Sequence, residues 1–115
     1  MEKNDHRDIW VFLEELEGKP KQVGAELLGQ ARRLADEIGQ EVAAVIIAHD
    51  ADEALEMARR YGADRAYVIE GECYRHFTAD PYAEAFSYLC EKYQPEIILV
   101  GATANGRELL SLIHI

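Results

Sequence analysis

The 115 residues are enough for one domain, and a hydrophobic content of 49% is enough for a core. The formal net charge of −10 disfavours nucleic-acid binding, because an acidic surface repels phosphates. Two cysteines, Cys73 and Cys90, are too few for a disulfide framework, and no apolar run reaches the ~18 residues of a membrane span. With no signal peptide at the polar start, we expect a cytoplasmic protein without membrane insertion.

Apolar runs of strand length alternate with amphipathic segments of helical spacing along the chain. The expected elements, in chain order, are a strand at 8–14, a helix at 23–38, a strand at 41–49, a helix at 50–61, a strand at 64–71, a helix at 81–93 and a strand at 96–102, followed by the start of another helix. This alternation predicts an α/β fold with three αβα layers, in which a parallel sheet is covered by helices on both faces.

Local signals predict where the helices begin and end. Gly39 and Gly62 are expected to end the first two helices in the left-handed conformation. Asp50 or Asp52 is the expected N-cap of the second helix. The third helix is expected to follow an Asp80 cap, and its apolar stripe is Tyr82, Phe86, Leu89, Cys90 and Tyr93, with Pro81 in the first helical position.

The stretch VGATANGRELL, residues 100–110, is the main candidate site. In open α/β sheets, ligands bind beyond the carboxyl ends of the strands, where the strand order reverses. With the order 3-2-1-4, this crevice lies between Glu14-Glu15 and residues 101–107. The candidate cofactor-binding residues, which supply backbone approach, hydroxyl contacts, free helix-start amides and a cation, are Gly101, Thr103, Gly106 and Arg107, with Asn105 as a further polar contact. The alternative is an ordinary strand-to-helix turn, because no Lys-Ser/Thr follows to make a phosphate-binding loop.

Other residues give weaker signals for chemistry. His49, Asp50 and Asp52 are close in sequence, but they do not have the spacing of a zinc or calcium site, so no metal is expected. His76 stands alone in a loop, and no serine or cysteine lies in a recognisable nucleophile motif. We therefore assign no catalytic residue.

Several segments in the same order resemble the alpha subunit of electron transfer flavoproteins. These are IWVFLE, the helix AELLGQARRLADEIG, YGADRAYVIE, and the run FTADPYAEAFSYLCEKYQPEIILVGATANGREL. The likeness spans residues 9–109. It implies a nucleotide-binding-like fold, similar to that of adenine nucleotide alpha hydrolases, and an N-terminal domain at 1–115 that lacks the C-terminal FAD-binding domain.

The resemblance also implies partners and a cofactor. The family forms a heterodimer with a beta subunit, carries FAD, and passes electrons from flavin dehydrogenases to a quinone reductase or another acceptor. Some members bifurcate electrons. This chain is then expected to be a scaffold and beta-subunit interface, not an enzyme, with no FAD bound tightly to it alone. Arg107 is expected to face the beta subunit or a flavin held there.

The last residues depart from the family pattern. LSLIHI, residues 110–115, resembles translated sequencing-adapter read-through, so the sequence is expected to be a truncated gene product. Two other functions stay open. One is a stand-alone ATP-binding module like a universal stress protein, although the glycine pattern of that family is not readable after the fourth strand. The other is an interaction domain without a ligand.

Overall fold

A four-stranded parallel sheet forms the centre of the molecule. In the computed structural model, which describes residues 7–113, its strands are β1 (Ile9–Phe12), β4 (Val42–Ala48), β5 (Arg65–Glu70) and β6 (Ile97–Leu99). They lie in the order β5-β4-β1-β6, which is the 3-2-1-4 order on which the position of the predicted crevice depends. The chain steps outward from β1 to β4 and β5, and then crosses back to place β6 on the other side of β1. The strand order therefore reverses between β1 and β6.

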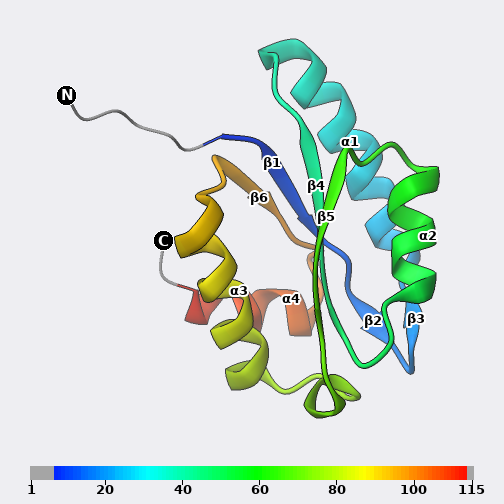
Figure 1. Cartoon of the computed structure of the whole chain (residues 1–115), viewed down its shortest axis with the longest axis vertical. Helices are drawn as coiled ribbons and strands as arrows, with labels where there is room; N and C mark the ends of the chain where they lie inside the picture. The colour runs from blue at the N-terminus through cyan, green and yellow to red at the C-terminus, as the bar shows by residue number, and fades with distance from the viewer. Residues whose placement is uncertain (1–6, 114–115) are drawn as a thin grey trace.

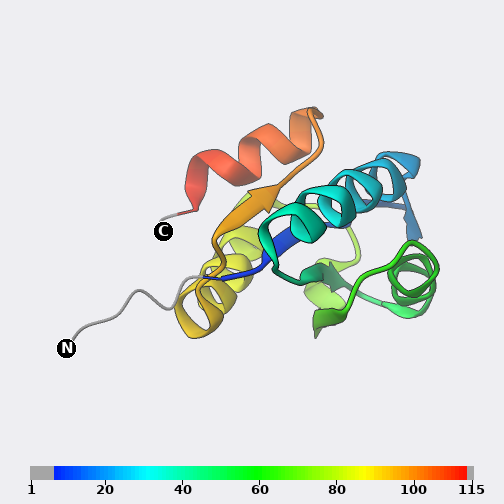
Figure 2. The same cartoon turned by 90° about the horizontal axis from the view of Figure 1, so that it is seen from above.

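Two helices cover each face of the sheet (Figures 1 and 2). The pair on one face is α1 (Gln22–Ile38) and α2 (Asp52–Arg60), and the pair on the other is α3 (Ala79–Tyr93) and α4 (Ala104–Leu112). A short 3-10 helix, η1 (Glu72–Tyr74), links β5 to α3. The three-layer α/β fold predicted from the sequence is confirmed. No helix in residues 7–113 has the length and apolarity to cross a membrane.

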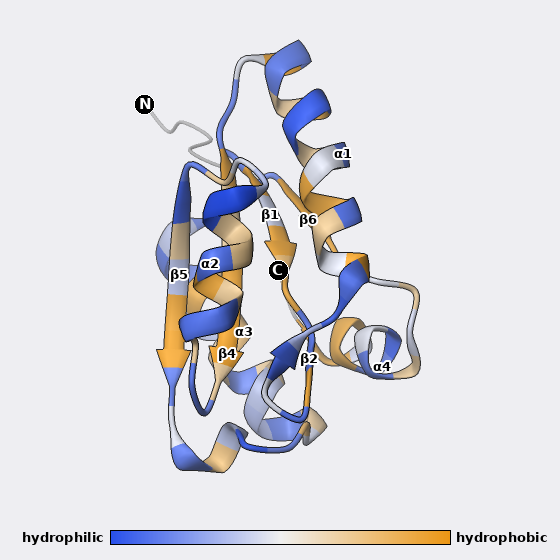
Figure 3. Cartoon of the chain, turned by 90° about the vertical axis from the view of Figure 1, so that its right-hand side faces the viewer, coloured by the Kyte–Doolittle hydropathy of each residue, from blue (hydrophilic) through white to orange (hydrophobic). Residues whose placement is uncertain are grey.

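The core has two halves, one on each face of the sheet. Along β1 and the residue after it, Ile9, Val11 and Leu13 pack against α1 and α2, whereas Trp10 and Phe12 pack against α3 and α4. Every residue of β1 and β4 is buried, because successive side chains of a central strand enter opposite core halves. Figure 3 shows the apolar strands behind helices whose outer surfaces are hydrophilic.

The first two helix ends follow the predicted signals closely. Gly39 closes α1 with a φ of 72°, and Gly62, with a φ of 92°, follows the end of α2. The N-cap prediction for α2 is wrong, because the N-cap is Ala51. Asp50 still accepts a hydrogen bond from the backbone N–H of Asp52 at 2.9 Å, so the aspartate acts one residue earlier than a cap.

The third helix begins earlier than expected. Its N-cap is Thr78, not Asp80, and Pro81 is its third residue. Proline is tolerated there because the first N–H groups of a helix have no intrahelical partner. Of the predicted stripe, Tyr93 is 41% exposed, and its ring lies 4.4 Å from that of Tyr67. The other four members of the stripe are buried.

A small hairpin follows β1 where the sequence predicts only a loop. It pairs β2 (Glu15–Leu16) with β3 (Lys19–Pro20). Glu17 and Gly18 form its two-residue turn, and their φ angles of 52° and 82° match the positive values of a type I′ turn. The hairpin begins directly after the buried end of β1, so it places Glu15 and Leu16 at the carboxyl edge of the sheet.

Candidate functional site

The turn between β6 and α4 is held by direct contact between its two glycines. A Cβ atom on Gly106 would lie 2.3 Å from the carbonyl oxygen of Gly101 and 2.8 Å from Cγ1 of Val100. Only glycine fits at position 106. Gly101 is also buried, against the side chain of Val23 in α1. The spacing of the two glycines thus lets helix α4 start directly against the end of β6.

Thr103 is the N-cap of α4 and connects the turn to β1. Its Oγ1 accepts a hydrogen bond from the N–H of Gly106 at 2.9 Å and donates one to Oε1 of Glu14 at 2.7 Å. The other carboxylate oxygen of Glu14 lies 2.9 Å from Nζ of Lys21. Glu14 is only 3% exposed and is the one buried charged residue in the part of the chain described.

This network connects the ends of β1 and β6. Glu14, Lys21 and Thr103 come from the strand end, the start of α1 and the start of α4, and hydrogen bonds join them at the switch point. One helix-start amide that the sequence suggested for an anion, that of Gly106, is already bound to Thr103. A buried carboxylate next to this helix start also disfavours a phosphate group there.

Arg107 lies apart from these buried contacts. Its side chain is exposed, and Nη1 donates a long hydrogen bond of 3.4 Å to the carbonyl oxygen of Ala102. None of the ion pairs found among residues 7–113 involves Arg107. The structure thus brings Gly101, Thr103 and Gly106 together in one turn and leaves Arg107 on its surface. Contact between any of the four and a flavin stays a prediction.

The acidic residues around His49 are occupied by local contacts. Carboxylate oxygens of Asp50, Asp52 and Glu70 approach within 4.8 Å of one another, and all three residues are exposed. Asp50 accepts from Asp52, and Glu70 accepts from the N–H of Ala51 at 2.9 Å. His49 points elsewhere and pairs with Glu72 at 3.0 Å. Two of these acids therefore stabilise the start of α2.

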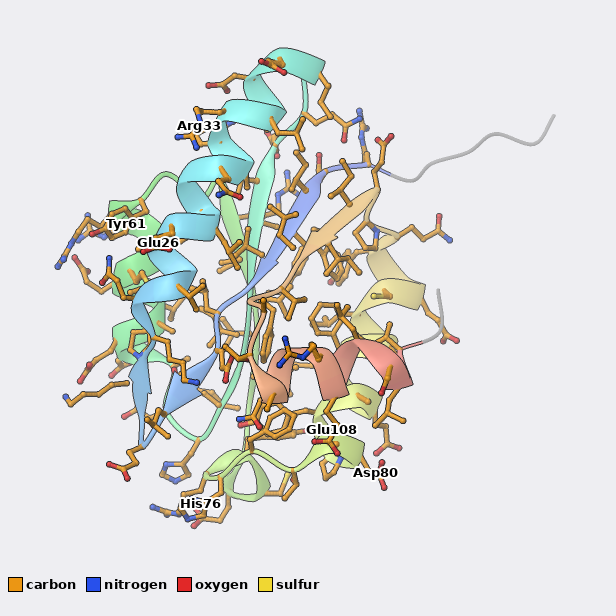
Figure 4. All side chains as sticks on the ribbon, turned by 180° about the vertical axis from the view of Figure 1, so that it is seen from behind. Glu26, Arg33, Tyr61, His76, Asp80 and Glu108 are labelled. Atoms are coloured by element: carbon orange, nitrogen blue, oxygen red, sulfur yellow. The ribbon has the colours of Figure 1, made fainter. Side chains whose placement is uncertain are left out.

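Two adjoining hollows open at the carboxyl edge of the sheet and share Glu15, Arg75 and His76 in their walls. Their volumes are about 310 and 250 Å³. Asn105 lines the larger hollow, whereas His49 and Asp50 line the smaller one. Figure 4 shows His76 at this end of the molecule. A larger hollow of about 460 Å³ lies between α2 and β5, away from the strand ends.

Glu15 is the unusual group in these walls. Its Oε2 is the one buried side-chain polar atom without a hydrogen-bond partner among residues 7–113. Burial, with smaller contributions from the charges of Asp50 and Glu53, raises the pKa of Glu15 to about 7. The sequence named Glu14-Glu15 as a pair, but it did not distinguish their roles. The alternation of side chains at a strand end is the signal that separates the paired acid from the unpaired one.

Replacing Glu15 with glutamine is expected to flatten the dependence of stability on pH. Because the folded pKa lies above the unfolded value of 4.5, folding favours protonated Glu15. Its stabilising effect is complete below pH 4.5 and is lost as the pH rises through 7. The variant should therefore match the parent near pH 4.5 and be more stable at pH 8, as urea unfolding followed by circular dichroism can measure. A variant less stable than the parent at pH 8 would contradict the assignment.

The fold and this edge define a three-layer α/β domain whose strand-end residues are tied together by Glu14. Residues 9–113 match the family model of the electron transfer flavoprotein domain. The chain therefore belongs to the electron transfer flavoprotein family. The resemblance seen in its sequence motifs is confirmed.

The chain is similar to several curated proteins over most of its length. The chain is 43% identical over 106 residues to an electron transfer flavoprotein subunit alpha from Thermoanaerobacterium thermosaccharolyticum, with 92% of this chain and 32% of that protein covered. It is 38% identical over 109 residues to Protein FixB from Rhizobium meliloti, with 91% and 31% covered. A third relative is the lactate dehydrogenase (NAD(+),ferredoxin) subunit LctC of Acetobacterium woodii, at 37% identity over 109 residues, with 95% and 26% covered. The chain spans about a third of the length of the first two.

Proposed function

We propose that this chain is the N-terminal α/β domain of a longer electron transfer flavoprotein alpha subunit. In that role it is a scaffold and beta-subunit interface in FAD-dependent electron transfer. The observation that carries the proposal is the family match over residues 9–113 in a chain that covers 32% of its alpha-subunit relative. The rest of such a subunit has room for a separate domain that holds the flavin.

The contacts at the switch point support a flavin site outside these residues. A flavin nucleotide needs a cradle of free amides or cations for its pyrophosphate. Here a Cβ on Gly106 would meet the backbone of Gly101 and not open space. The hydroxyl of Thr103 already makes two hydrogen bonds, one to Glu14 and one from the N–H of Gly106. These contacts support the proposal that the turn does not cradle the pyrophosphate and that its flavin contact, through Arg107, is with a cofactor held by the beta subunit. The chain alone is therefore proposed to bind no FAD tightly, and redox chemistry belongs to the cofactor in the parent complex.

Electron donors and acceptors are proposed at the level of the family. A relative from Anaerotignum propionicum at 38% identity is named acryloyl-CoA reductase electron transfer subunit beta. This name supports the proposal that the parent complex serves a particular redox enzyme. The parent complex of this chain is proposed to take electrons from a flavin dehydrogenase and to pass them to a quinone reductase or another acceptor. The same proposal includes parent complexes that bifurcate electrons.

Substitution of Arg107 tests the proposed interface with the beta subunit. Its guanidinium is exposed and outside the ion pairs described for residues 7–113, so it is available to a carboxylate or a reduced flavin of the beta subunit. In a full-length alpha subunit co-expressed with its beta partner, Arg107→Ala is expected to weaken the heterodimer by about ten-fold or to shift a flavin potential. Isothermal titration and redox titration measure the two effects.

Arg33→Ala is the matched control for this experiment. Arg33 is also an exposed arginine, but it projects from the outer face of α1 (Figure 4). The control is expected to leave heterodimer affinity and both flavin potentials unchanged. Should Arg107→Ala behave like Arg33→Ala, Arg107 is an ordinary surface residue and its assignment to the interface fails.

A further inference from the structure

We draw no further inference here: the strongest candidate, the apolar and half-buried strand β6 (Ile97–Leu99) at one edge of the sheet, carries nothing because nothing in residues 7–113 shows what covers that edge.

Discussion

Replacing Gly106 with alanine is expected to lower the free energy of unfolding by about 3 kcal/mol, which is the upper part of the range for overpacked sites. The new Cβ would lie 2.3 Å from the carbonyl oxygen of Gly101. This neighbour is backbone at the end of a core strand, so it cannot rotate away as a flexible side chain would. Relief requires α4 to move away from β6. Urea unfolding followed by circular dichroism measures the loss.

Gly29→Ala is the control for the same substitution. Gly29 lies within α1, where an added Cβ would meet only Nη1 of Arg33, at 4.0 Å. Alanine in a helix interior is favoured over glycine by roughly 0.5–1 kcal/mol, so this variant should be slightly more stable than the parent. If Gly106→Ala were as stable as Gly29→Ala, the tight packing of the turn would be refuted.

Replacing Glu14 with alanine is expected to cost about 3 kcal/mol, because it removes the centre of the network at the switch point. Thr103 and Lys21 would each lose a partner, at 2.7 and 2.9 Å respectively. The variant is compared with Glu26→Ala, which removes an exposed carboxylate from the outer face of α1 (Figure 4). The control should stay within about 0.5 kcal/mol of the parent.

A double-mutant cycle isolates the contact between the strand end and the turn. Thr103→Val removes the hydroxyl that donates to Glu14 and caps α4. With Glu14→Ala, the cycle should give a coupling free energy of about 1 kcal/mol. Additive effects of the two substitutions would mean that Glu14 is held by Lys21 alone and that the turn is independent of β1.

Periodicity was sufficient to predict the layers, whereas the strand order 3-2-1-4 was an assumption made to locate the crevice. The unbroken apolar runs of β1 and β4 and the stripe of α1 are local patterns, and Gly39 ends its helix where predicted because a left-handed residue at that point favours glycine. The N-cap residues of α2 and α3 were predicted wrongly. Asp50 accepts a bond at the start of α2, whereas Thr78 stands at the N-cap of α3 without a side-chain hydrogen bond, so the residue type alone does not place a cap.

The side-chain contacts at the candidate site could not be predicted from the sequence. Glu14 and Thr103 are 89 positions apart, and no local pattern predicts that their side chains meet. The glycines of the turn were correctly associated with close backbone approach, but the group approached at Gly106 is the chain's own Gly101. Likewise, the sequence does not predict that Oε2 of Glu15, in the hairpin, is buried without a hydrogen-bond partner.

The tail of the chain is described only in part. Leu110 and Leu112 belong to α4, and the family match extends to residue 113. The remaining residues of the LSLIHI segment, His114 and Ile115, lie outside the described residues. Its origin from adapter sequence stays a prediction, which sequencing of the source locus across this position tests directly.

A domain that is a scaffold for the beta subunit must bind that subunit. Sedimentation velocity of the 115-residue chain, mixed at micromolar concentration with the electron transfer flavoprotein beta subunit encoded with it, reports whether the domain is an interface. We expect a 1:1 complex, with the visible flavin absorbance absent from the chain when it sediments alone. Independent sedimentation of the two proteins, or stoichiometric flavin on the chain itself, would contradict the proposal that this domain is a flavin-free scaffold for the beta subunit.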